Sequence, residues 1–253
     1  MVKFENIEIK YGDFVAIENL NLDIKEGEFF TFLGPSGCGK TTSLRALVGF
    51  LSPSKGKVYV GDKDVTNLPV EKRNIGMVFQ SYDLFPNKTV LGNITLAPTL
   101  VQKRDKGEVE QEAIRLLERV GLADRKDSWP HELSGGQRQR VAICRALILH
   151  PEVLLFDEVT AALDPEMVRE VLDVMLELAD SGQTMLIVTH EMQFARAIAD
   201  QVILLEDGDI VERSDDAERF FTNPTTERAK QFLHTFEFDR HRKSAEQSER
   251  SEQ

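Results

Sequence analysis

The chain has 253 residues, of which 41% are hydrophobic and 29% charged, and a formal net charge of −12. This composition predicts a soluble globular protein, long enough for one large α/β domain or for a core with a subdomain. The acidic balance argues against non-specific binding to nucleic acid or to an anionic bilayer. No apolar run reaches the roughly 20 residues of a membrane span.

The first 85 residues predict strands around one helix. Alternating segments at 2–12 and 14–28 are typical of edge strands, and the apolar run that follows is typical of a buried strand entering a glycine turn. A helix is expected at 41–53, ended by Pro53. A hairpin at 55–65 and a strand at 74–80 complete this part.

From about residue 86 the sequence pattern predicts helices, and after residue 150 it predicts strands that alternate with helices. Apolar residues recur at helical spacing in 107–122, at Val109, Ala113, Leu116, Leu117 and Val120. Further on, strands are expected at 151–158, 184–190 and 201–211, with helices at 138–150, 165–182 and 191–200. This alternation predicts an α/β fold with a mostly parallel sheet.

We therefore expect four parts in the chain. They are a nucleotide-binding core with antiparallel β structure and the phosphate loop (1–85), a helical subdomain (86–150), the rest of the core with a carboxyl-terminal helix (151–238) and a polar tail without aromatic residues, expected to be disordered (239–253).

Residues 34–41 read GPSGCGKT and fit the phosphate-loop pattern G-x-x-x-x-G-K-[ST] between a predicted strand and a predicted helix. Glycines let backbone N–H groups close on phosphate oxygens, and the helix start adds the positive end of its dipole. Lys40 is expected to reach the β and γ phosphates, and the Thr41 hydroxyl to bind Mg²⁺. The predicted nucleotide-binding residues here are Gly34, Pro35, Ser36, Gly37, Cys38, Gly39, Lys40, Thr41 and Thr42. Cys38 and the second cysteine, Cys144, are expected to be free thiols.

Polar residues end three other predicted strands. Strand 153–158 ends in Asp157, which we expect to hold Mg²⁺, and in Glu158, a candidate general base for the attacking water whose alternative role is to cap the next turn. Gln80 and His190 end two more strands, where each could touch the γ-phosphate or the water, and Gln80 is also a candidate Mg²⁺ ligand. Because ligands gather at the carboxyl ends of parallel strands, these side chains should lie near the phosphate loop.

Residues 130–140, PHELSGGQRQR, hold a second glycine-rich loop, without a lysine, and FDE follows at 156–158. With the phosphate loop, these motifs resemble the ATP-binding cassette (ABC) ATPases, the motor subunits of ABC transporters, from Tyr11 to about residue 235. The resemblance implies that Tyr11 stacks on adenine, that Gln80 is the Q-loop glutamine and that His190 is the switch histidine. It also assigns Asp164 to the D-loop and the ATP-binding signature to Ser134, Gly135, Gly136 and Gln137.

The D-loop departs from the family's pattern. It usually reads S-A-L-D after P-T, whereas EVTAALD has Val159 and Ala161 in place of the proline and the serine. Loss of a hydroxyl at Ala161 removes one possible hydrogen bond across a dimer. Glu158, Asp164 and His190 are intact, so catalysis is still expected.

The two glycine-rich loops of one subunit cannot both reach the same phosphates. Two copies placed head to tail bring each signature over the other copy's phosphate loop, so that Ser134, Gly135 and Gly136 bind the γ-phosphate from the opposite side. ATP then drives closure because it binds the closed dimer better than the open one. Hydrolysis removes the bridging phosphate and lets the dimer reopen.

Without a membrane segment, the chain is expected to act as a separate ATPase of an importer. It is expected to bind a membrane permease at the cytoplasmic face of the inner membrane. An extracytoplasmic binding protein would deliver the solute to that permease. Phe85 and Pro86 resemble the family's permease contact, with local packing as the alternative. Segment 64–86 looks like importers of polyamines, sugars or inorganic anions, whereas 156–175, 188–200 and 220–233 are similar to polar amino-acid importers, which we favour. A soluble ABC ATPase and a small-molecule kinase are the remaining alternatives, and no nucleic-acid partner is expected.

Overall fold

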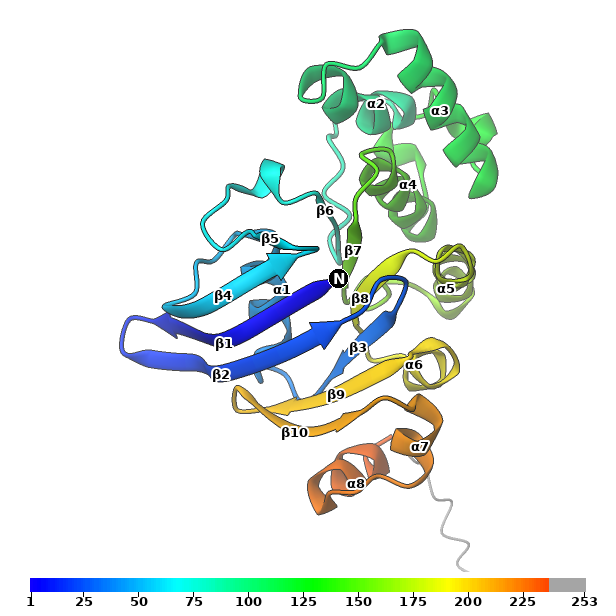
Figure 1. The fold of residues 1–253 in the computed structure, drawn as a ribbon. Coiled ribbons are helices and arrows are strands. Elements are labelled where there is room, and N and C mark those ends of the chain that lie inside the picture. Colours follow the sequence, from blue (N-terminus) through cyan, green and yellow to red (C-terminus); the bar gives the residue numbers. More distant parts are fainter. Residues whose placement is uncertain (237–253) are drawn as a thin grey trace, which may run out of the picture.

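The computed structural model describes residues 1–236, and the predicted tail at 239–253 lies outside the described residues. These residues form two sheets (Figure 1). The smaller sheet is antiparallel with the order β2–β1–β4–β5, from the strands β1 (Val2–Tyr11), β2 (Phe14–Ile24), β4 (Lys55–Val60) and β5 (Lys63–Asp64). The expected amino-terminal antiparallel β structure is confirmed.

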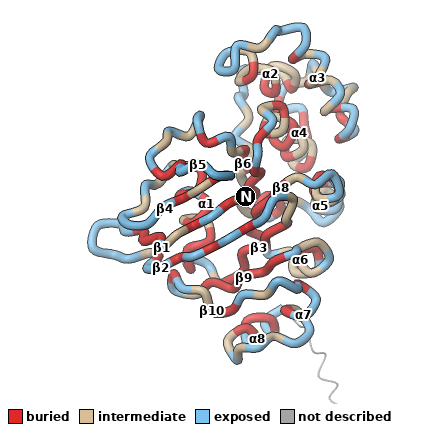
Figure 2. The backbone as a smooth tube through the Cα atoms, in the orientation of Figure 1, coloured by how far each residue is buried: buried red, intermediate tan, exposed pale blue. Residues whose placement is uncertain are grey.

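The larger sheet has the order β10–β9–β3–β8–β7–β6. Its strands are β3 (Phe29–Leu33), β6 (Ile75–Phe79), β7 (Val153–Asp157), β8 (Thr184–Val188), β9 (Gln201–Glu206) and β10 (Asp209–Ser214). All neighbours pair in parallel except β10, which returns antiparallel along β9. The predicted α/β fold with a mostly parallel sheet is confirmed. Its strands β3, β7 and β8 are nearly continuous runs of buried residues, as Figure 2 shows.

Eight α-helices lie within residues 1–236. They are α1 (Lys40–Val48), α2 (Val90–Leu100), α3 (Lys106–Arg119), α4 (Gly135–Leu147), α5 (Pro165–Asp180), α6 (Met192–Ile198), α7 (Ala217–Thr222) and α8 (Glu227–His234). Short 3₁₀ turns lie between β5 and β6, at Val70–Lys72, and between α3 and α4, at Ala123–Arg125 and Pro130–Glu132. None of the helices in this part of the chain is long and apolar enough to cross a bilayer.

The central sheet is covered on both faces. On one face, α1 places Leu44 and Leu47 in a core shared with both sheets, so this helix is packed between them. On the other face, buried residues of α4, α5 and α6 pack against β3, β7 and β8. Packing from both sides holds the carboxyl ends of the parallel strands rigidly, which is what a functional site at that edge requires.

The helical subdomain stands at one end of the molecule, with α7 and α8 at the other (Figure 1). Val109, Ala113 and Leu117, one face of α3, are fully buried against α2 and α4. The helical spacing read from 107–122 is thereby confirmed. The predicted subdomain begins after β6 and ends after α4, and the division of the chain into parts stays a prediction.

The helix after the phosphate loop is shorter than expected. It ends at Val48, and Gly49 follows with a φ of 96° and an N–H that bonds to the Arg45 carbonyl oxygen at 3.1 Å. Glycine adopts this left-handed conformation without steric cost, so the helix stops five residues before Pro53. The prediction that Pro53 ends it was wrong. Both cysteines are free, as predicted, and both are buried.

Candidate functional site

The phosphate loop wraps around the ammonium group of Lys40. At Gly34, where the loop leaves β3, φ is 142°, and a Cβ would lie 2.1 Å from the carbonyl oxygen of Leu205. Only glycine fits that approach. Lys40 begins α1 and is 5% exposed, and its Nζ donates to the carbonyl oxygens of Gly34 at 2.7 Å and Pro35 at 2.9 Å. The loop therefore encloses a positive charge beside the positive end of the α1 dipole.

A cavity of about 150 Å³ opens over this loop. It is lined by Ser36, Gly37, Gly39, Lys40, Thr41, Thr42 and Glu158. Its wall is the first turn of α1, whose backbone N–H groups have no partner within the helix and so favour an anion. The predicted general base thus faces the same cavity as most of the predicted phosphate-binding residues.

Thr41 and Asp157 meet at the edge of this cavity. The Thr41 hydroxyl donates to Asp157 Oδ1 at 2.9 Å, which joins the start of α1 to the end of β7. Burial raises the pKa of Asp157 and the Thr41 hydrogen bond opposes that rise. A hydroxyl and a carboxylate are hard oxygen donors, and Mg²⁺ at a nucleotide uses one or two such protein ligands together with phosphate oxygens and water. The two residues therefore fit Mg²⁺.

Glu158 and His190 form a second pair beside the first. His190 Nε2 lies 3.1 Å from Glu158 Oε1, and both side chains are partly exposed. The backbone of Glu158 is left-handed, with a φ of 50°, and its N–H bonds to the Val188 carbonyl oxygen at 2.9 Å. Such a conformation is uncommon for a residue with a side chain and is frequent at functional sites.

Three other predicted residues do not line the cavity over the phosphate loop. Gln80 follows β6 and is exposed, Tyr11 ends β1 with 46% of its surface exposed, and Asp164 precedes α5 and is exposed. Within residues 1–236, no side-chain hydrogen bond joins these three to Lys40 or Asp157.

The signature residues serve the start of α4. The Ser134 side chain accepts from the N–H of Gln137 at 3.2 Å, and the Gln137 side chain accepts from the N–H of Ser134 at 3.0 Å, a capping box. The Gly136 N–H points at Met167 Sδ, 3.4 Å away on α5. In the described chain, none of the signature residues lines the cavity over the phosphate loop.

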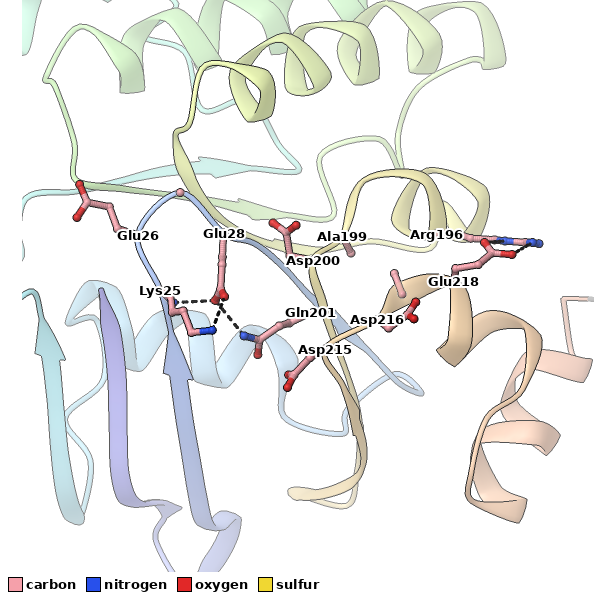
Figure 3. A pocket seen from close by; sticks show the side chains of 12 residues that line it. Lys25, Glu26, Glu28, Arg196, Ala199, Asp200, Gln201, Asp215, Asp216 and Glu218 are labelled. Atoms are coloured by element: carbon pink, nitrogen blue, oxygen red, sulfur yellow. Dashed lines mark hydrogen bonds and ion pairs between the residues drawn. The ribbon is translucent and has the colours of Figure 1, made fainter.

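A larger cavity, of about 760 Å³, lies at the opposite end of the parallel strands, beside the starts of β3 and β9 (Figure 3). It is rich in carboxylates, but several of them already have partners. Glu28 accepts from the Lys25 N–H at 2.7 Å and from Gln201 Nε2 at 2.9 Å, and Glu218 is paired with Arg196. We therefore place the candidate site at the phosphate loop.

Gln139 was not singled out from the sequence, although it touches the strand that leads to Gln80. It is fully buried on α4, and its Nε2 donates to the Phe79 carbonyl oxygen at 3.3 Å. A signal was available, because Gln139 shares the apolar helical face of Ala142, Ile143 and Ala146. A polar residue on such a face calls for a buried partner.

Known proteins share this fold and these motifs. A family model described as ABC transporter matches residues 17–161. The chain is 48% identical over 237 residues to the glutamate transport ATP-binding protein GluA of Corynebacterium efficiens and 47% identical over 237 residues to the glutamine transport ATP-binding protein GlnQ of Bacillus subtilis. In both cases the match covers 92% of this chain and 98% of the relative.

Solved structures agree. A dimeric structure of the ATP-binding cassette MJ0796, in a post-hydrolysis state bound to ADP and Pi, is 35% identical with a TM-score of 0.75, over 85% of this chain and 98% of that one. The predicted resemblance is confirmed, and the motifs that carried it lie on the fold that the resemblance implied. The chain belongs to the ABC transporter family, as an ATP-binding subunit.

Proposed function

We propose that this protein is the ATP-hydrolysing subunit of an importer for polar amino acids. The observation that carries the enzymatic part is the pairing of Thr41 with Asp157 and of Glu158 with His190 around the cavity over the phosphate loop. A carboxylate next to a phosphate-binding loop, oriented by a histidine, is an arrangement suited to activating water.

The roles follow from the positions. Lys40 and the N–H groups at the start of α1 bind the phosphates, and Thr41 and Asp157 hold Mg²⁺, which neutralises charge on the phosphate oxygens when bound. Glu158 accepts a proton from the attacking water, and His190 fixes the Glu158 carboxylate through the 3.1 Å contact. Gln80, at the end of the next strand over, is placed to contact the metal or the water once nucleotide is present.

Tyr11 is proposed to stack on the adenine ring. Its exposed side chain ends β1, and the adjoining strand β2 carries Ile17, whose side chain would lie 3.3 Å from a Cβ at Gly39 in the phosphate loop. The hairpin that presents Tyr11 is thus in contact with the phosphate loop. An exposed aromatic ring beside a phosphate site gives a base a face to stack on.

A second copy of the chain is proposed to complete each site. The signature residues lie at the start of α4, away from the phosphate loop of their own chain, with Asp164 exposed nearby before α5. A head-to-tail dimer would aim them at the other copy's nucleotide. The MJ0796 cassette, which is similar to this chain, is dimeric in both solved structures, which supports the pairing of two copies.

The permease is proposed to dock at the helical subdomain, beside Phe85 and Pro86. Both residues are exposed in the loop between β6 and α2, and 46% of the Phe85 side-chain surface faces solvent. An exposed aromatic residue five positions after Gln80 gives a membrane partner an apolar contact on the segment that carries Gln80. The protein would thereby be held at the cytoplasmic face of the inner membrane.

Polar amino acids are the proposed solutes because the relatives at 46–48% identity are named for glutamate, glutamine, arginine or general amino-acid transport. The cassette does not touch the solute itself, so this step rests on similarity. Importers of polyamines, sugars or inorganic anions are the second candidate, favoured by segment 64–86.

The test is transport. The chain, the permease encoded beside its gene and the accompanying binding protein are placed in sealed vesicles, and ATP-dependent uptake of labelled glutamate, glutamine and arginine is compared with that of spermidine, maltose and sulfate. Uptake of an amino acid, abolished by Glu158→Gln, is expected. Uptake of spermidine, maltose or sulfate alone would instead identify the second candidate.

Co-purification separates transport from other roles of the family. A tagged chain extracted in detergent is expected to bring down an integral membrane protein. If ribosomes or nucleic acid came down in its place, the protein would belong with the soluble ABC ATPases.

A further inference from the structure

The loop between β6 and α2 has an unusual backbone. Tyr82 and Asp83 have φ values of 62° and 47°, and neither is a glycine. Left-handed backbone is sterically unfavourable for residues with side chains, and two such residues in a row need contacts that hold them. Gln80 lies two residues before this pair and Phe85 two residues after it, so the pair sits between two proposed functional residues.

Arg145 of α4 supplies those contacts. One guanidinium nitrogen donates to the carbonyl oxygen of Asp83 at 2.7 Å and the other to that of Tyr82 at 3.2 Å. The same group lies over the Phe85 ring, 5.7 Å from its centre. A planar guanidinium can bond two adjacent acceptors at once and stack on an aromatic ring, which no other side chain can do. Arg145 therefore contacts three residues of the loop, two through hydrogen bonds and one through its aromatic ring.

Within residues 1–236, no carboxylate forms an ion pair with Arg145, although the side chain is partly buried. Burial lowers the pKa of the Arg145 guanidinium, and the Asp83 charge acts in the opposite direction. A partly buried cation whose hydrogen bonds all go to two loop carbonyls stabilises the conformation of that loop.

Other residues of α4 bind the same segment. Gln139 donates to the Phe79 carbonyl oxygen at 3.3 Å, and the Arg138 guanidinium lies 5.1 Å from the centre of the Tyr82 ring. The helix that carries these side chains begins at the signature glycines. The residue before Gln80 and three of the residues after it are thus attached to one rigid helix.

We propose that Arg145 is a positioning residue, which holds the left-handed backbone of Tyr82 and Asp83 against α4 and thereby fixes Gln80 at the edge of the central sheet. The loop and α4 then move as one body. The proposal rests on the proposed role of Gln80 in hydrolysis. The alternative is a purely structural role, in which Arg145 only attaches the helical subdomain to the core.

Steady-state ATP hydrolysis by the purified chain separates the two. Arg145→Met keeps the aliphatic length but loses both hydrogen bonds and the charge, and should lower kcat by about tenfold while KM for ATP changes less than about twofold. Arg145→Lys should fall between this variant and the wild type, because an ammonium group cannot bond both carbonyls and stack on Phe85.

Arg140→Met is the matched control. Arg140 lies on the same helix and donates to the Val120 carbonyl oxygen and to Glu170, both at 2.8 Å, without touching the loop. Its loss should lower the melting temperature but leave kcat within about twofold. If Arg140→Met and Arg145→Met lowered kcat equally, Arg145 would be a structural residue and the proposal would be overturned.

Amide hydrogen exchange tests whether Arg145 holds the loop, independently of catalysis. A peptide spanning residues 80–86 should exchange faster in Arg145→Met than in the wild type, and not in Arg140→Met. Unchanged exchange in Arg145→Met overturns the proposal. If exchange accelerates but Gln80→Ala hydrolyses ATP at the wild-type rate, Arg145 does hold the loop, and the proposed role of Gln80 in hydrolysis is wrong.

Discussion

His190 Nε2 lies 3.1 Å from Glu158 Oε1, although 32 residues separate the two in sequence. The pairing of β7 with β8 creates this contact, because Asp157 stands opposite Val188 in the parallel register and the two polar residues follow their strands. The left-handed turn at Glu158 then directs its carboxylate toward the phosphate loop. The geometry favours one catalytic unit built from two strand ends.

Glu158→Gln should bind ATP but hydrolyse it at least about 100-fold more slowly, because an amide cannot accept the proton of the attacking water. The substitution keeps the size of the side chain, so the site itself should survive. Size-exclusion chromatography with ATP should show a trapped dimer. Turnover at the wild-type rate would remove Glu158 from the role of base.

His190→Ala should lower kcat by at least about tenfold, with little change in the Kd for ATP, because the carboxylate loses the side chain that orients it. His150→Ala is the control. His150 is an exposed histidine paired with Glu112 after α4. Equal rates for the two variants would show that the contact with Glu158 has no catalytic consequence.

Asp157→Asn should abolish Mg²⁺-dependent hydrolysis and yet stabilise the folded chain at pH 7. Burial raises the pKa of Asp157, so the charged carboxylate is less favourable in the folded state than in the unfolded one. The stabilising contribution of a raised pKa is present below the unfolded value of about 3.9 and is lost as the pH rises through the folded value.

Urea unfolding should therefore give Asp157→Asn the higher midpoint at pH 7, and the difference should shrink as the pH falls toward about 4. A variant less stable than the wild type at pH 7 would mean that the hydrogen bond from Thr41 outweighs the cost of burial.

Glu212 of β10 holds the start of α8. Its carboxylate accepts from the N–H groups of Thr225 and Thr226 at 2.8 Å and from the Thr226 hydroxyl at 2.7 Å. Burial acts to raise the pKa of Glu212, but these hydrogen bonds outweigh it, and the pKa is lowered. The resulting stability is present above the unfolded pKa of about 4.3 and is lost as the pH falls through the folded value.

Glu212→Gln should cost about 2 kcal/mol of unfolding free energy at pH 7, because an amide replaces a charged acceptor of three hydrogen bonds. The cost should decrease below about pH 4. Glu227→Gln, at an exposed carboxylate paired with Lys230, is the control and should change little. Equal effects of the two substitutions would contradict this account of the α8 attachment.

Much of the fold could be predicted because its signals are local. The continuous apolar runs of β3, β7 and β8 indicated buried parallel strands, and the spacing of Val109, Ala113 and Leu117 indicated a helix. The end of α1 differs from the end expected at Pro53, because Gly49 already supplies the left-handed residue that a helix end needs.

Part of the candidate site could also be predicted from local signals, and part could not. Motif spacing identified Lys40, Thr41 and Asp157, and the general rule for parallel sheets placed them at one edge. The hydrogen bonds from Arg145 to Tyr82 and Asp83 could not be predicted, because they join residues more than 60 positions apart through backbone carbonyls. Backbone acceptors leave no trace in residue type, so only the folded chain reveals them.

We propose that each ATP site is shared between two copies of the chain. Lys40→Ala removes the phosphate-loop half and Ser134→Arg blocks the signature half, so each variant alone should be inactive. In an equal mixture, half of the dimers carry one intact site, and the ATPase rate should reach about a quarter of the wild-type rate. A mixture as inactive as its components would contradict the shared site and place hydrolysis within a single subunit.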